Sequence, residues 1–193
     1  MNIKSLLAAT FAVASMSMLS MAQTRTIEHE YSEFDAISVS DGFKVSFVES
    51  DGYSAKFKVN DAFESYVQCY VKAGTLYIGV DDKSIPKEVK KSFKGKNSDD
   101  PVLEATVYVP SLKAVTLSDN CTFSCDKDIN APKFTLELSG TSSVSNLNIH
   151  VAESAVITVS KKAKLSSVNV KAEDKVTVNA EGNASVVLEY SAK

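Results

Sequence analysis

The sequence contains few of the side chains from which catalytic and metal sites are usually built. Its 193 residues include two histidines, three cysteines and a single arginine, Arg25. Three cysteines are too few for a disulfide framework, and the spacing of Cys69, Cys121 and Cys125 matches no zinc pattern. No glycine-rich phosphate loop or nucleophile elbow occurs. The sequence therefore predicts no catalytic residue, no metal site and no cofactor.

Surplus positive charge is also missing. The chain has 21 Lys and Arg residues against 24 Asp and Glu residues, which gives a formal net charge of -3. Binding to nucleic acid requires clustered positive charge that neutralises phosphates. We therefore expect no nucleic-acid partner.

Long hydrophobic runs are confined to the N-terminus. Lys4 precedes an apolar run over residues 6–21, which ends in the small-x-small sequence Ser20-Met21-Ala22. This pattern is typical of a secretory signal peptide, and no later segment is apolar enough to span a bilayer. We expect residues 1–22 to be removed and the product to be exported, to the periplasm, the cell surface or the medium. Residues 23–193 then form a single domain.

The N-terminal half alternates apolar and polar residues, which predicts strands with one buried face. Asp41-Gly42 and Asp51-Gly52 interrupt the alternation where turns are needed. The alternation then breaks over residues 82–100, which contain Pro86, Gly95 and a cluster of lysines with acidic neighbours. We expect an exposed insertion with a short helix there, and a solvated loop in preference to a site for anionic glycans or lipid head groups.

The C-terminal half repeats a short phrase. It occurs at residues 115–118, 136–139, 157–160 and 176–179, in steps of 21, 21 and 19 residues. Units this short cannot fold alone and bury their apolar residues by stacking. They predict an all-β fold, a right-handed parallel β-helix with coils of about 21 residues and three faces, in which the N-terminal part continues or caps the stack. A β-sandwich would explain the alternation but not the repeat. When the repeated phrases are aligned with one another, Leu138, Val159 and Val178 occupy equivalent positions. We therefore expect them to stack on one another with their side chains in the core.

Candidate chemical groups are few. Two adjacent aspartate pairs, Asp81-Asp82 and Asp99-Asp100, are the candidates for paired carboxylates, and both flank the lysine-rich segment as turn residues do. His29 lies near the expected new N-terminus, in a part of the chain predicted to be mobile, and the alternation directs His150 outward.

The sequence does not decide whether Cys121 and Cys125 form a disulfide. In a straight strand the Cα atoms of Cys121 and Cys125 would lie about 13 Å apart, so a bridge requires a corner between them. Both outcomes stay open, and Cys69 is expected to pack as a small buried residue.

Several segments resemble one known family, the secreted auto-transporter adhesins of the head GIN type that are common in Bacteroidetes. The segments are Phe34-x-x-Ile37-x-Val39, Gly42-Phe43-x-Val45, Gly74-x-Leu76-x-Ile78, Val107-x-Val109-Pro110-x-Leu112 and Leu138-Ser139-Gly140. The resemblance covers nearly all of the chain after the signal peptide and implies a β-helical protein of the cell envelope. This chain has bulkier residues where the family repeats glycine, at Ser118-Asp119-Asn120, Ser160-Lys161-Lys162 and Asn179-Ala180-Glu181.

Together these observations favour a non-enzymatic envelope or secreted protein, an adhesin or scaffold that binds a glycan or an envelope protein through its β-helix surface. The alternative is a carbohydrate-active enzyme, a polysaccharide lyase or glycosidase, whose site the sequence does not reveal. No residue can be assigned to binding from the sequence. A strand near the C-terminus, around Leu188 and Tyr190, predicts self-association or partner docking through the last coil.

Overall fold

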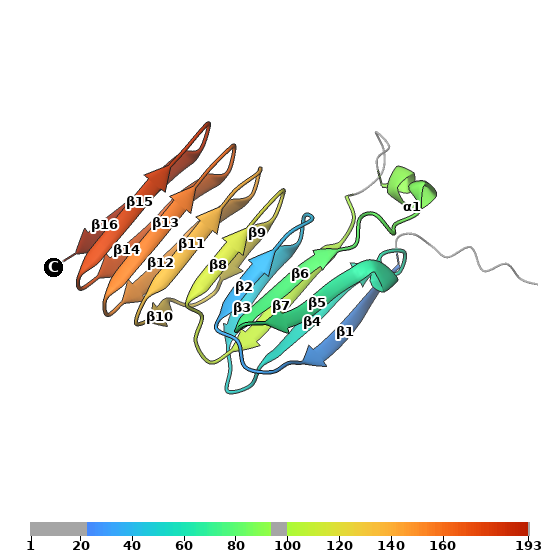
Figure 1. Cartoon of the computed structure of the whole chain (residues 1–193), viewed down its shortest axis with the longest axis horizontal. Coiled ribbons are helices and arrows are strands. Elements are labelled where there is room, and N and C mark those ends of the chain that lie inside the picture. The colour runs from blue at the N-terminus through green and yellow to red at the C-terminus, as the bar shows by residue number, and fades with distance from the viewer. Residues whose placement is uncertain (1–22, 94–99, 193) are drawn as a thin grey trace, which may run out of the picture.

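A computed structural model describes residues 23–93 and 100–192, and the predicted signal peptide lies outside the described residues. These ranges form two β-sheets that run side by side along the length of the molecule (Figure 1). The expected all-β class is therefore confirmed. No helix in the described ranges is long and apolar enough to cross a membrane.

One sheet has nine strands and the other has seven. The nine-stranded sheet contains, in spatial order, β1 (Thr24–Glu30), β4 (Ser54–Asn60), β7 (Leu103–Val109), β3 (Lys44–Glu49), β9 (Thr122–Cys125), β12 (Ser143–Val151), β14 (Lys164–Ala172) and β16 (Ser185–Ala192), with β10 (Ile129–Ala131) paired to β12. The seven-stranded sheet contains β15 (Lys175–Ala180), β13 (Ser154–Val159), β11 (Phe134–Leu138), β8 (Ala114–Leu117), β2 (Ala36–Val39), β6 (Thr75–Val80) and β5 (Val67–Lys72). The remaining elements are a 3-10 turn, η1 (Glu64–Tyr66), and one helix, α1 (Lys87–Ser92).

In the C-terminal half, each strand of the seven-stranded sheet is followed by a strand of the nine-stranded sheet, and we call this pair a coil. Successive coils pair in parallel: β8 with β11, β11 with β13, and β13 with β15. Alternate side chains point between the two sheets, so Leu136 and Ile157 lie opposite each other and are fully buried. The core is thus a continuous apolar layer between the sheets.

Left-handed residues form the corner of each coil. Asp119, Gly140, Lys161 and Gly182 have φ angles of 59°, 70°, 61° and 69°. Their numbers differ by 21, so the corners recur once per coil. Two of these corner residues, Asp119 and Lys161, stand in segments where this chain replaces the glycine of the family it resembles, and both adopt the left-handed conformation although it is costly for most side chains. Backbone hydrogen bonds hold the corners together, as from Ser160 N to Leu138 O at 2.9 Å.

The predicted register is wrong in the last coil. Val159 lies opposite Leu138 on one side but opposite Ala180 on the other, and Val178 instead lies opposite Ile157. The phrase at residues 176–179 resembles the earlier phrases, but the corner at Gly182 fixes the step at 21 residues, not 19. The register shifts by one residue only in the next strand, β16. Leu165 lies opposite Val186, whereas Val168 lies opposite Leu188, so an irregularity falls between Leu165 and Val168.

The expected three faces form only two sheets. β12 and β14 turn through left-handed residues, Asn146 with a φ of 56° and Ser167 with a φ of 54°. The ladder between these two strands continues past both residues, so each of the two strands stays unbroken and no third sheet forms there.

The N-terminal part continues the stack and ends it with antiparallel strands. β2 pairs in parallel with both β6 and β8, and β3 pairs in parallel with both β7 and β9. Beyond them, β4 pairs antiparallel with β7, β1 with β4, and β5 with β6. The sheets are therefore mixed, and the stack is not parallel throughout.

The segment predicted as an exposed insertion is anchored at two points. Ile85 is 5% exposed and belongs to the core, and the ring centroid of Phe93 lies 5.0 Å from that of Phe63. The expected short helix is present as α1, with Lys90 bonded to Asp82 at 2.8 Å. Residues 94–99 lie outside the described ranges.

Candidate functional site

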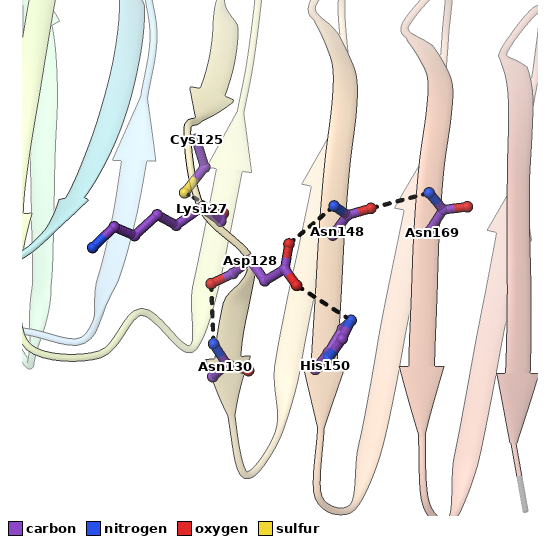
Figure 2. Close-up of polar contacts among 7 residues, drawn as sticks. All are labelled: Cys125, Lys127, Asp128, Asn130, Asn148, His150 and Asn169. Atoms are coloured by element: carbon purple, nitrogen blue, oxygen red, sulfur yellow. Dashed lines mark hydrogen bonds and ion pairs between the residues drawn. The ribbon is translucent and has the colours of Figure 1, made fainter.

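A row of polar side chains crosses the outer face of the nine-stranded sheet. Asn148 on β12 and Asn169 on β14 are direct partners in the parallel ladder, and both occupy outward positions of their strands. Asn169 Nδ2 donates to Asn148 Oδ1 at 3.0 Å, and Asn148 Nδ2 donates to Asp128 Oδ1 at 2.9 Å (Figure 2). The three side chains form one hydrogen-bonded chain across three coils.

A second row lies two residues further along the same strands. Asn130, His150, Lys171 and Ser191 occupy equivalent positions on β10, β12, β14 and β16. His150 Nε2 lies 3.6 Å from Asp128 Oδ2, so the carboxylate of Asp128 links the two rows (Figure 2). The side chains of His150 and Asp128 are 40% and 46% exposed, which leaves both open to a ligand.

Two surface hollows lie along these rows. The first has a volume of about 430 Å³ and is bordered by Asp128, Asn169 and Glu189. The second has a volume of about 460 Å³ and lies towards Glu173. Because both are lined by His150, Lys171 and Ser191, they form one open groove across the strands, which we call the amide groove.

The chemistry of the amide groove suits a hydroxyl-rich ligand. An amide carries two N–H donors, and the hydrogen-bonded row uses one of them in each asparagine. The carboxylates of Asp128, Glu173 and Glu189 outnumber the single ammonium group of Lys171, so the groove favours a neutral ligand over an anionic one. Tyr190 also borders the first hollow, but it is the ladder partner of the buried Val170 and so belongs to the inward side of the last strand. Hydrogen-bond donors and acceptors that converge on one surface are typical of a specific polar site.

The two carboxylates that border the first hollow are too far apart for glycoside hydrolysis. Asp128 and Glu189 occupy the two ends of a row that continues through Asn148 and Asn169, three strand spacings in all. Three spacings amount to about 14 Å, whereas the two carboxyl groups of a glycosidase are about 5 to 9.5 Å apart.

Other candidates from the sequence, the described aspartates of the two pairs and His29, do not lie in this groove. Ser84 donates to Asp81 at 2.6 Å, which holds the pKa of the Asp81 carboxyl below its usual value, and Asp82 pairs with Lys90. Asp99 lies outside the described ranges, and Asp100 is exposed. His29 belongs to strand β1, where its ring meets the edge of Tyr31 at 6.3 Å, so the expected mobile N-terminus is instead a strand.

None of the three cysteines, all within the described ranges, is in a disulfide. Cys121 is fully buried, and its burial raises the pKa of the thiol to about 11. Cys125 lies near the groove and donates to Lys127 O at 2.9 Å (Figure 2). Cys69 is half-buried beside Tyr31, and burial raises its pKa to about 11 as well. Over the described ranges, no three His, Cys, Asp or Glu residues gather in a way that could hold a metal ion.

Sequence reasoning placed His150 on the surface but missed Asp128, Asn148 and Asn169. One signal was available: the two asparagines are 21 residues apart, which is the length of one coil. Asp128 lies outside the repeated phrase and gives no such signal.

Comparison with known proteins gives a consistent result. Residues 33–186 match a family model described as "Putative auto-transporter adhesin, head GIN domain". The fold is similar to "a putative adhesin" from Bacteroides fragilis, at 13% identity, 88% coverage of this chain, 98% coverage of that chain and a TM-score of 0.52. It is also similar to "a putative cell adhesion protein" from Clostridium sporogenes, at 11% identity, 88% and 100% coverage and a TM-score of 0.54. No curated protein is similar in sequence. Because the family model covers most of the chain, this protein belongs to the head GIN domain family of auto-transporter adhesins.

Proposed function

We propose that this chain is an exported, non-enzymatic adhesin that binds glycans through the amide groove. Family membership supports adhesion in general, and the hydrogen-bonded row of Asp128, Asn148 and Asn169 supports the choice of surface. In this proposal the coils wind as a right-handed parallel β-helix, which sets outward residues of successive strands about 4.8 Å apart in straight rows. A row of that kind presents the same donor at regular intervals to a polymer of repeating sugar units.

The observation that carries the proposal is the amide row itself. An exposed asparagine on a soluble sheet is ordinary, but here two asparagines and an aspartate are joined by bonds of 2.9 and 3.0 Å. Such bonds fix the side chains before a ligand arrives, so less rotational freedom is lost when it binds.

A glycan array probed with residues 23–193 tests this proposal. Replacing Asn148 and Asn169 together by alanine should weaken binding about tenfold, since two donors are lost. Asn183→Ala is the matched control, because Asn183 is also an exposed asparagine but lies in the corner between β15 and β16, outside the groove. Equal binding by the double variant and the control would refute the assignment of the groove.

The alternative, a carbohydrate-active enzyme, predicts turnover of the glycans that bind. Incubation of each array hit with the protein, followed by chromatography of the products, separates the two functions. Released fragments would favour the enzyme, and intact glycans with retained binding favour the adhesin.

A second surface concerns the last coil, which we infer pairs with a second copy of this chain. Positions buried in earlier coils are exposed there: Val178 is 36% exposed, whereas its partner Ile157 is fully buried. If two β15 strands pair antiparallel about Val178, Lys175 of one copy meets Glu181 of the other, so the charges are complementary. Light scattering should then give a dimer mass that Leu188→Lys abolishes. A wild-type protein that stays monomeric at micromolar concentration would exclude this pairing.

A further inference from the structure

Two tyrosines stack on the outer face of the seven-stranded sheet, far from the amide groove in the fold. Tyr70 on β5 and Tyr77 on β6 are direct partners in the antiparallel ladder. Their ring centroids lie 5.2 Å apart with an interplanar angle of 15°, and Tyr70 is 50% exposed. Large aromatic side chains on a solvent face gain little from the core, so an exposed stacked pair points to a contact surface.

A small hollow of about 110 Å³ adjoins this pair. It lies over Gly79, which is the ladder partner of Gln68 and has no side chain to fill the space. A Cβ atom added to Gly79 would lie 2.5 Å from Ser40 Oγ and 2.7 Å from Asp41 Oδ2. Glycine at this position therefore leaves room for the Ser40 hydroxyl and the Asp41 carboxylate, which approach the strand beside the hollow.

The polar groups of the hollow are held in place. Asp41 Oδ2 accepts a hydrogen bond from Ser40 Oγ at 2.5 Å and another from Val80 N at 3.0 Å. These bonds fix the carboxylate on the wall of the hollow, where it is an acceptor for hydroxyl groups. Gln68, which also lines the hollow, offers an amide with both a donor and an acceptor.

We propose that Tyr70, Tyr77, Gln68 and Asp41 form a binding site for a neutral saccharide, which we call the tyrosine site. A sugar ring has a face of C–H groups that suits an aromatic ring and an edge of hydroxyl groups that suits an amide and a carboxylate. The hollow is too small for a whole ring, so it receives one hydroxyl or hydroxymethyl group while the ring lies against the tyrosine pair. The carboxylate of Asp41 disfavours an anionic ligand.

Outward residues extend this site across the sheet. The ladder pairs place one row next to the tyrosines, with neighbouring strands about 4.8 Å apart. The row runs Tyr70, Tyr77, Ser38, Thr116, Glu137, Thr158 and Asn179. Its hydroxyl, carboxylate and amide groups can contact further units of a chain that begins at the tyrosines, so longer oligosaccharides should bind more tightly than short ones.

Tyrosine emission provides the measurement, because the chain has seven tyrosines and no tryptophan. The probes are cellohexaose, xylohexaose and mannohexaose, titrated into residues 23–193. At least one of them should change the emission saturably, and Tyr70→Ala and Tyr77→Ala should each weaken its binding about tenfold. Tyr70→Phe should retain binding, and Tyr108→Ala, a half-buried tyrosine on the other sheet, is the matched control. Thermal melts confirm that each variant is folded.

The amide groove provides the control that separates this site from the proposed function. The double variant with alanine at Asn148 and Asn169 should leave the tyrosine-dependent binding unchanged. If that variant loses the binding and Tyr70→Ala keeps it, the groove is the binding surface and the tyrosine site is refuted. If none of the three probes binds, or if Tyr70→Ala changes only the solution mass, the tyrosine site is also refuted, in the second case in favour of contact with another copy.

Discussion

Gly140 stacks directly on Asp119 in the corner of the preceding coil. A Cβ atom added to Gly140 would lie 2.6 Å from Asp119 N, closer than real Cβ contacts allow. The two residues share the left-handed conformation, but only Gly140 has no room for a side chain.

Three glycine-to-alanine variants separate two contributions to the loss of stability at such a corner, the strain of a left-handed φ and the steric clash of an added Cβ atom. Gly52→Ala meets no neighbour within 4 Å and has no left-handed φ, so its effect should be small. Gly42→Ala has open space but a φ of 81°, and should lose about 1 kcal/mol. Gly140→Ala combines strain with the clash and should lose about 2 to 3 kcal/mol. Urea unfolding measures the order, and equal losses for Gly42 and Gly140 would contradict the close stacking.

The register of the last coil predicts two unequal aspartate variants. Val159 is fully buried between Leu138 and Ala180, so Val159→Asp should lower the free energy of unfolding by more than about 3 kcal/mol. Val178 is 36% exposed at the end of the stack, so Val178→Asp should lose much less. Thermal scans of both proteins suffice, and a Val159→Asp protein that melts like wild type would show that the register is misplaced.

Cys121 predicts a loss of stability at alkaline pH. Burial raises the pKa of its thiol from 9.0 to about 11, so the folded state keeps the proton that the unfolded state releases. The contribution is complete below pH 9 and is lost as the pH rises to about 11, by about 2 to 3 kcal/mol. The stability difference between wild type and Cys121→Ala should therefore shrink over this interval. A difference that stays constant with pH would mean that the thiol is not shielded.

The segment over residues 82–100 remains predicted to be dispensable for the fold. Replacing it with a short Gly/Ser linker should leave a folded protein, because closure entropy changes slowly with loop length. Ile85 is buried, so this deletion should lower the melting temperature more than replacement of residues 87–99 alone, which retains Ile85. Circular dichroism measures the melting temperatures of both variants. If the protein that lacks residues 87–99 is unfolded, this segment is required for the fold and the prediction is wrong.

Much of the C-terminal fold was predictable, because each phrase is a local pattern that repeats. The error at Val178 arose where the pattern was only approximate: Val176-Thr177-Val178-Asn179 looks like Ile157-Thr158-Val159-Ser160, but backbone pairing sets the register. The left-handed corners recur every 21 residues and indicate the true register. Two of them are occupied by Asp119 and Lys161, which are not glycine, so the sequence alone does not identify these corners. The N-terminal order could not be predicted, since nothing local places β2 between β6 and β8.

The candidate sites were harder to predict for a similar reason. Asn148 and Asn169 are ordinary residues until the ladder makes them neighbours. Tyr70 and Tyr77 are close in sequence, but their stacking depends on the hairpin register of β5 and β6. A site made of outward residues from several strands leaves no continuous motif.

The position of β2 and β3 has a consequence for how the protein assembles. They form the first coil along the chain, yet later strands cover them on both sides, β6 and β7 on one and β8 and β9 on the other. Growth that simply adds each new coil to the last cannot produce this order. We therefore expect β2 and β3 to act as a folding nucleus to which strands add on both sides, β6 and β7 on one side and the later coils up to β16 on the other. Since contacts between distant parts of the chain form slowly, closure of the N-terminal side should limit the folding rate, while the C-terminal coils add rapidly.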